Sequence, residues 1–132
     1  MYTFSPAVRN ARAQVIADAL DAGSGPAQWQ FYTGPQPAAG GAVTTQTLLA
    51  TVLLTDPCGT VTDGVLTLTS AGDVLAVATG LIAWARFTDS AGGIVLDADV
   101  GAPGSGAAVT IDNPQVYAGG TVRIVSATLT EA

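Results

Sequence analysis

Apolar side chains recur every three or four positions near the start of the chain, a spacing typical of a helix with one buried face. Ser5 can cap the first turn, Pro6 suits the first helical position, and Gly23 can end the helix. We therefore expect one helix over residues 5–22, with a buried stripe of Val8, Ala11, Val15, Ile16, Ala19 and Leu20.

After residue 24 the pattern changes to short runs rich in Thr and Val, separated by turn signals such as TGPQP, DPCG and GAPGSG. We expect strands at residues 28–33, 48–55, 65–70, 81–89, 93–97, 107–112 and 121–130, with a weaker one at 73–78. This predicts a mainly β fold, an antiparallel β-sandwich or jelly roll of seven or eight strands with one N-terminal α-helix. Residues 1–24 would form an arm and helix, and residues 25–132 the sandwich of a single compact unit.

Two of the expected strands, LIAWARFTD and TVRIVSATLT, have no wholly hydrophilic face. In the first, Ile82 and Trp84 alternate with Leu81 and Phe87. A subunit packed among neighbours would show this pattern, although a two-sided sandwich core explains much of it. We expect association, as a homodimer or homotrimer, with Trp29, Phe31, Trp84 and Phe87 mainly in the core.

The charge balance narrows the possible partners and reactions. The 132 residues carry a net charge of -6, with four arginines, no lysine and no histidine. A nucleic-acid partner is not expected, because the chain cannot assemble a basic stripe. Without histidine or lysine, Ser-His-Asp, Cys-His and Ser-Lys catalysis are excluded. The single Cys58 cannot form an internal disulfide and reads as a small buried apolar side chain.

Signals for export or membrane insertion are not visible. The N-terminus has no basic region followed by an apolar run, and the apolar windows are too short or interrupted to cross a bilayer. We expect synthesis in the cytoplasm and no membrane partner.

Carboxylates and aromatics are the remaining candidates for chemistry. Asp89, Asp97 and Asp99 could gather around calcium or supply an acid and a base, but aspartate beside glycine is also ordinary turn chemistry, which we favour. A row of Trp29, Tyr32 and Trp84 could stack on sugars, although buried sandwich aromatics are commoner. We expect no catalytic residue, no cofactor and no metal site, and hence no enzyme.

Two regions are candidates for binding a partner. Arg9 and Arg12, three residues apart on one helix face, could dock on an acidic surface, or simply be solvated. The second region is a long, nearly uncharged loop that begins with Thr33, Gly34, Pro35, Gln36 and Pro37.

The runs FYTGPQPAAGGAVTTQTLLATVLLTDP, WARFTDSAGGIVLDADVG and YAGGTVRIVSATLTE, about half of the chain, resemble small proteins encoded among the head genes of tailed bacteriophages. Such proteins are similar to capsid decoration or cement proteins. The resemblance implies a jelly-roll or sandwich fold, binding to the major capsid protein, a dimer or trimer, and a location on the capsid surface of the virion. It also suggests that the apolar MYTF segment acts as an arm, although the helix after it departs from a simple extended arm.

Three alternatives remain. A phage tail, collar or fibre component would share the composition. A carbohydrate-binding module would expose a Trp and Tyr row. A small carboxylate hydrolase would bring two Asp side chains together in a cleft, roughly 5 to 10 Å apart.

Overall fold

The computed structural model describes residues 3–38 and 40–130, and the side chains of these residues except that of Thr130. These described residues contain one helix, α1 (Pro6–Asp21). The strands are β1 (Gln28–Tyr32), β2 (Leu48–Thr62), β3 (Val65–Ser70), β4 (Val74–Leu75), β5 (Gly80–Leu81), β6 (Trp84–Thr88), β7 (Ile94–Gly101), β8 (Val109–Ile111), β9 (Gln115–Val116), β10 (Thr121–Val122) and β11 (Ile124–Thr130). The predicted mainly β fold with one N-terminal helix is confirmed.

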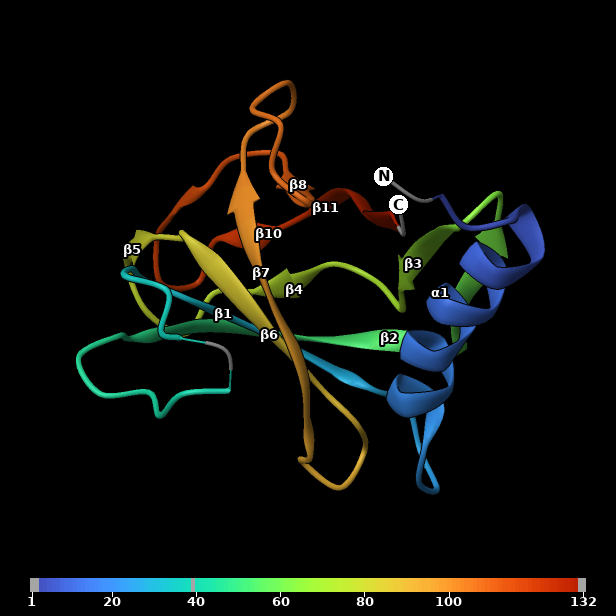
Figure 1. Ribbon diagram of the computed structural model, residues 1–132. Helices are drawn as coiled ribbons and strands as arrows, with labels where there is room; N and C mark the ends of the chain where they lie inside the picture. Colours follow the sequence, from blue (N-terminus) through green and yellow to red (C-terminus); the bar gives the residue numbers. More distant parts are fainter. Residues whose placement is uncertain (1–2, 39, 131–132) are drawn as a thin grey trace.

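Seven strands form a closed barrel in the order β1-β2-β3-β11-β8-β7-β6, with β6 returning to β1 (Figure 1). The prediction of a sandwich or jelly roll was therefore too specific, since one sheet closes on itself. Most neighbours are antiparallel, but β7 and β8 pair in parallel at Val100 and Gly101, and this short contact completes the circle. Closure leaves no edge strand in the sheet.

Strand β2 explains much of the difference from the predicted topology. The DPCG sequence was expected to be a turn, but it lies inside this 15-residue strand as an irregularity between Leu54 and Gly59. The first half of β2 pairs with β1 and the second half with β3. At the bend, a Cβ on Gly59 would collide with the carbonyl oxygen of Thr67, so only glycine allows this close approach.

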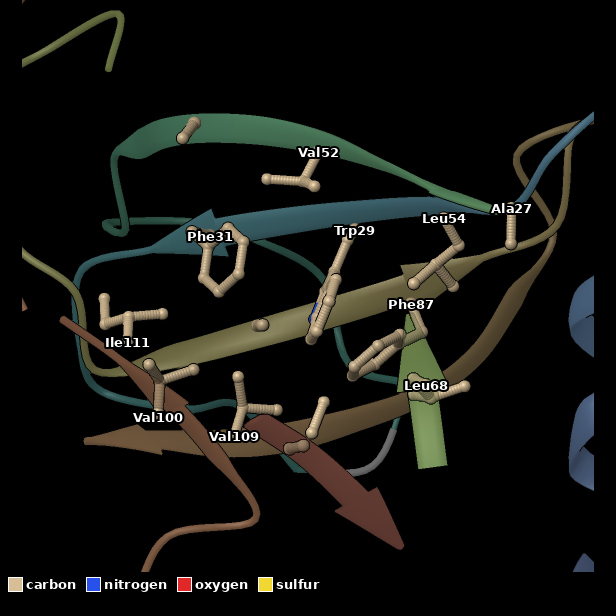
Figure 2. Packing of buried hydrophobic residues seen from close by; sticks show 14 of the residues in the cluster. Ala27, Trp29, Phe31, Val52, Leu54, Leu68, Phe87, Val100, Val109 and Ile111 are labelled. Atoms are coloured by element: carbon tan, nitrogen blue, oxygen red, sulfur yellow. The ribbon is translucent and has the colours of Figure 1, made fainter. Parts of the chain in front are cut away.

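The barrel interior is filled by aromatic and aliphatic side chains, most of them from alternate positions of the strands (Figure 2). Trp29 lies at the centre, with its ring centroid 5.5 Å from that of Phe31 and 4.8 Å from that of Phe87. All three side chains are fully buried, as predicted. Aliphatic residues surround them, including Val52, Leu54, Leu68, Val100, Val109 and Ile111.

Helix α1 begins and ends close to its predicted bounds, and the Ser5 hydroxyl accepts a hydrogen bond from the Val8 N–H at 3.3 Å. Its buried face matches the prediction only in part, since Leu20 is buried and Ile16 packs against the core but the other contacts differ. Val8 and Val15 are 43% and 67% exposed, whereas Ala13 and Ala17 are buried with Leu20. Small alanines let the helix backbone approach the barrel, so they form the contact in place of the larger valines.

Two polar side chains of α1 fix its position on the barrel. Asn10 Oδ1 accepts a hydrogen bond from the Gly64 N–H at 2.6 Å, and Asp21 Oδ1 accepts one from the Cys58 N–H at 2.9 Å. An aspartate in the last helical turn opposes the helix dipole, but here its carboxylate satisfies a barrel amide. The helix and the barrel share one hydrophobic core.

Candidate interaction surfaces

The predicted partner-binding loop, residues 33–47, joins β1 to β2 and folds back over its own barrel. The Thr33 N–H donates to the Thr47 carbonyl at 3.1 Å, and the Thr47 N–H donates to Thr33 Oγ1 at 2.9 Å. Gln46 Nε2 donates to the Pro35 carbonyl at 2.6 Å. Gly34, Pro35 and Gln36 are exposed, whereas Thr33 and Pro37 are partly buried. The exposed tip of the predicted site is thus three residues wide.

Beneath the loop lies a buried polar cluster on the outer side of the barrel. Arg86 donates to both Asp97 carboxylate oxygens, from Nε at 2.8 Å and from Nη2 at 3.0 Å, and its Nη2 also donates to the Gly41 carbonyl at 2.6 Å. The two side chains are only 7% and 2% exposed. The carboxylate hydrogen bond raises the pKa of Arg86, so the guanidinium stays charged. This buried pair attaches the loop to the barrel.

Two aromatic rings complete this cluster. Tyr32 and Trp84 stack with ring centroids 4.8 Å apart, the Arg86 guanidinium lies 5.2 Å from the Trp84 ring, and Trp84 Nε1 donates to the Thr33 carbonyl at 2.9 Å. Burial raises the pKa of Tyr32, opposed by the charge of Arg86. Trp84 is buried as predicted, but between the barrel and the loop and not in the central core.

A surface pocket of about 450 Å³ opens beside the loop, lined by Gln36, Gly40 and residues 94–97 of β7. A second one, of about 330 Å³, lies between β2 and residues 71–74. Among the described residues that line the first pocket, the one charged side chain is Asp97, which is already bonded to Arg86. A ligand in this pocket would therefore contact backbone groups and uncharged side chains, and no free charged group among the described lining residues.

The other predicted region, on α1, lies at the opposite end of the barrel. The loop adjoins the start of strand β2 at Leu48. Helix α1 is hydrogen-bonded to the second half of the same strand, at Cys58 (Figure 1). The Arg12 guanidinium lies 4.6 Å above the Phe4 ring, and Arg9 Nε is buried with no hydrogen-bond partner among the described residues. The arginines and the loop tip therefore do not form one continuous surface. Met1 and Tyr2 of the expected arm lie outside the described residues.

The three aspartates considered for calcium or catalysis have separate structural roles. Asp89 Oδ1 accepts hydrogen bonds from the N–H groups of Ala91 and Gly93, at 3.0 and 2.8 Å, in the turn between β6 and β7. Asp97 is paired with Arg86, and Asp99 Oδ1 accepts from the Ala108 N–H at 3.0 Å. Among the described residues, no group of three or more His, Cys, Asp or Glu side chains could hold a metal ion. The turn interpretation is confirmed for Asp89. It is wrong for Asp97 and Asp99, which lie within strand β7.

The aromatics proposed as a sugar platform do not lie together on the surface. Trp29 and Trp84 are fully buried, one inside the barrel and the other outside it, and Tyr32 is 9% exposed. No row of exposed rings is formed by these three residues. The geometry on which the carbohydrate-binding alternative depended is absent from them.

A further exposed surface was not predicted from the sequence. It lies on β4, β5 and the segments that follow β4 and β9, and it consists of four apolar side chains that are 57% to 69% exposed: Leu75, Val77, Leu81 and Tyr117. We call this group the ribbon face, because these short strands pair with one another as a two-stranded ribbon. The signal was the alternation of large and small residues in VLAVATGL, but a pattern apolar on both sides does not say which side is buried.

Neither a protein-family model nor a curated protein nor a solved structure matches this chain. Within the described part of the chain, no helix has the length and apolar character needed to span a membrane.

Proposed function

We propose that this chain is a structural protein of a tailed-phage virion, a capsid decoration protein that binds the major capsid protein shell and stabilises the head. The observation that carries the proposal is the separation of its candidate binding features to two ends of one filled barrel. The loop tip lies at one end, next to the part of the ribbon face where the Val77 N–H donates to the Leu49 carbonyl. Helix α1 lies at the other end and carries the exposed Arg12 and the partly buried Arg9. A subunit with two such ends can bridge neighbouring capsomers, and many weak symmetric contacts give firm attachment.

The use of the polar side chains favours binding over catalysis. Four carboxylates accept hydrogen bonds inside the protein, those of Asp21, Asp89, Asp97 and Asp99. The Arg86 guanidinium is bound in its buried pair with Asp97. The Cys58 thiol is buried, and its pKa is raised to about 12, chiefly by burial and then by the charge of Asp21, so it is a poor nucleophile near neutral pH. These groups serve stability, which suits a scaffold.

The shell attachment is assigned to α1, since Arg9 and Arg12 place two positive charges on the first half of the helix in a chain of net charge -6. Capsid surfaces rich in carboxylates would complement them. The tip Gly34-Pro35-Gln36 would touch a second shell subunit. A tail, collar or fibre component is the alternative within the same class.

The test is binding of the purified chain to undecorated capsids of the encoding phage. Arg9→Gln with Arg12→Gln takes the net charge from -6 to -8 by removing two positive charges. We expect occupancy to fall at least tenfold, more strongly at low salt than at high salt, because the lost contacts are electrostatic.

The matched control, Ala102→Glu with Asn113→Asp, reaches the same net charge of -8 at exposed positions that follow β7 and β8. It should bind nearly as the wild type does. Equal loss in both variants would mean that net charge, and not the helix, governs attachment. Absence of wild-type binding to capsids would refute the decoration proposal itself.

A further inference from the structure

The two short sheets β4–β10 and β5–β9 are parts of one ribbon. Leu75 pairs with Thr121 and Gly80 with Val116, so five residues along one segment match five along the other. Between these pairs, the Ala76 N–H donates to the Gly120 carbonyl and the Gly119 N–H donates to the Ala76 carbonyl, both at 2.8 Å. The register is therefore continuous through the irregular middle. The ribbon is residues 74–81 against residues 115–122.

The two sides of this ribbon are both apolar, but only one is covered. Ala76, Val116 and Val122 belong to the shared core and are at most 4% exposed. On the other side, Leu75 and Val77 are 62% and 69% exposed, and Leu81 and Tyr117 are 57% and 63% exposed. A sheet that faces water normally carries polar residues on that side. Four large apolar groups on one ribbon indicate a contact surface.

Charge identifies the partner that fits this surface. Residues 74–81 and 115–122 contain no aspartate, glutamate, lysine or arginine. At the edge of the ribbon, Arg123 Nε lies 3.4 Å from Asp73 Oδ2, and these side chains are 65% and 43% exposed. Such an exposed pair is held weakly within one subunit. The edge thus carries one charge of each sign.

A surface with one positive and one negative group at its edge is self-complementary. In a two-fold contact, Asp73 of one copy can meet Arg123 of the other, and the reverse pair forms by symmetry. Of the four arginines in the sequence, two are on α1 and Arg86 is buried, so Arg123 is the one that the barrel exposes. Other exposed charges of the barrel, such as Asp56, Asp63 and Asp112, are negative, so a contact between two copies at those positions would bring like charges together.

From these observations we infer that the ribbon face binds the ribbon face of a second copy of this chain, in a two-fold contact edged by reciprocal Asp73–Arg123 pairs. This inference does not depend on shell binding, since it concerns the purified chain alone.

The experiment is sedimentation velocity of the full chain from about 5 to 500 µM. The subunit mass is 13.1 kDa, so the expected species at high concentration has twice that mass. Leu75→Gln with Leu81→Gln should raise the dissociation constant at least tenfold. The control Val15→Gln with Ile94→Gln removes two comparably exposed apolar residues, 67% and 49% exposed, outside the ribbon, and should leave the dissociation constant unchanged.

Charge exchange separates a two-fold contact from any other. Arg123→Asp alone should weaken the dimer at least tenfold, because the edge becomes wholly acidic. Adding Asp73→Arg should restore it, because the exchanged charges again pair across the symmetry axis. Circular dichroism and thermal melting should show that each variant is folded.

Three results would overturn the inference: a wild-type chain that stays monomeric at 500 µM, a dimer unaffected by the Leu75 and Leu81 changes, or a charge exchange that fails to restore association. If the leucine variant stays monomeric like the wild type and loses only capsid binding, the ribbon face belongs to the shell instead.

Discussion

Replacing Asp97 by asparagine tests whether the buried pair beneath the loop stabilises the fold as its geometry indicates. The change keeps the shape of the side chain and removes the charge that compensates Arg86. Both side chains are almost completely buried, at 7% and 2% exposure. The guanidinium would then be left in a poorly solvated site with a neutral partner.

The expected cost follows from that burial. Removing one partner of a buried ion pair costs about 3 to 5 kcal/mol, and asparagine retains one acceptor oxygen, so we expect about 3 kcal/mol. For a chain of 132 residues this corresponds to a fall in melting temperature of roughly 10 °C. It is a large share of the ~5–15 kcal/mol stability of a typical domain.

The assay is urea unfolding followed by tryptophan fluorescence, since Trp29 and Trp84 are both buried in the native state. Asp112→Asn, which removes an exposed carboxylate, is the control and should change stability by less than about 0.5 kcal/mol. Arg86→Leu with Asp97→Leu should lower the free energy of unfolding by less than Asp97→Asn does, because no charge then stays buried. If Asp97→Asn is as mild as the control, the pair is solvated and the loop is not attached as described.

Two further variants test the packing of α1. In the folded protein the pKa of Cys58 is about 12, against an ordinary value of 9.0, so the native structure favours the protonated thiol. The stability that this preference contributes is complete below pH 9 and is lost as pH rises towards 12. In urea unfolding, the free energy of unfolding of the wild type should therefore fall by about 1 kcal/mol more than that of Cys58→Ala between pH 8 and pH 10. Equal falls in the two proteins would show that burial of the protonated thiol does not contribute to stability. Asn10→Ala leaves the buried Gly64 N–H without its acceptor and should cost about 1 to 3 kcal/mol by the same assay, whereas the exposed Gln14→Ala should cost less than about 0.5 kcal/mol. Equal effects of these two helix substitutions would show that Asn10 does not hold α1 in place.

Local signals in the sequence predicted local structure well. Ser5, Pro6 and Gly23 located the helix because caps act within a single turn. The buried face of α1 was predicted only in part: Leu20 and Ile16 do contact the core, but the choice between Val15 and Ala17 depends on how closely the barrel approaches. That distance is a property of the assembled fold.

The pairing of distant segments could not be predicted in the same way. The parallel contact between β7 and β8 that closes the barrel has no sequence signature of its own, and the DPCG turn signal became a bend inside β2. The loop composition likewise gave no sign that the Gly41 carbonyl would bind Arg86, 45 residues away. The ribbon face needed the register of β4 with β10 before its exposed side could be assigned.

Cryo-electron microscopy of virions of the encoding phage tests the decoration proposal most directly. The proposal predicts a barrel-shaped density of 13.1 kDa subunits repeated over the icosahedral lattice, with α1 against the shell. Density confined to the tail or the portal vertex, or none in the particle, would contradict it.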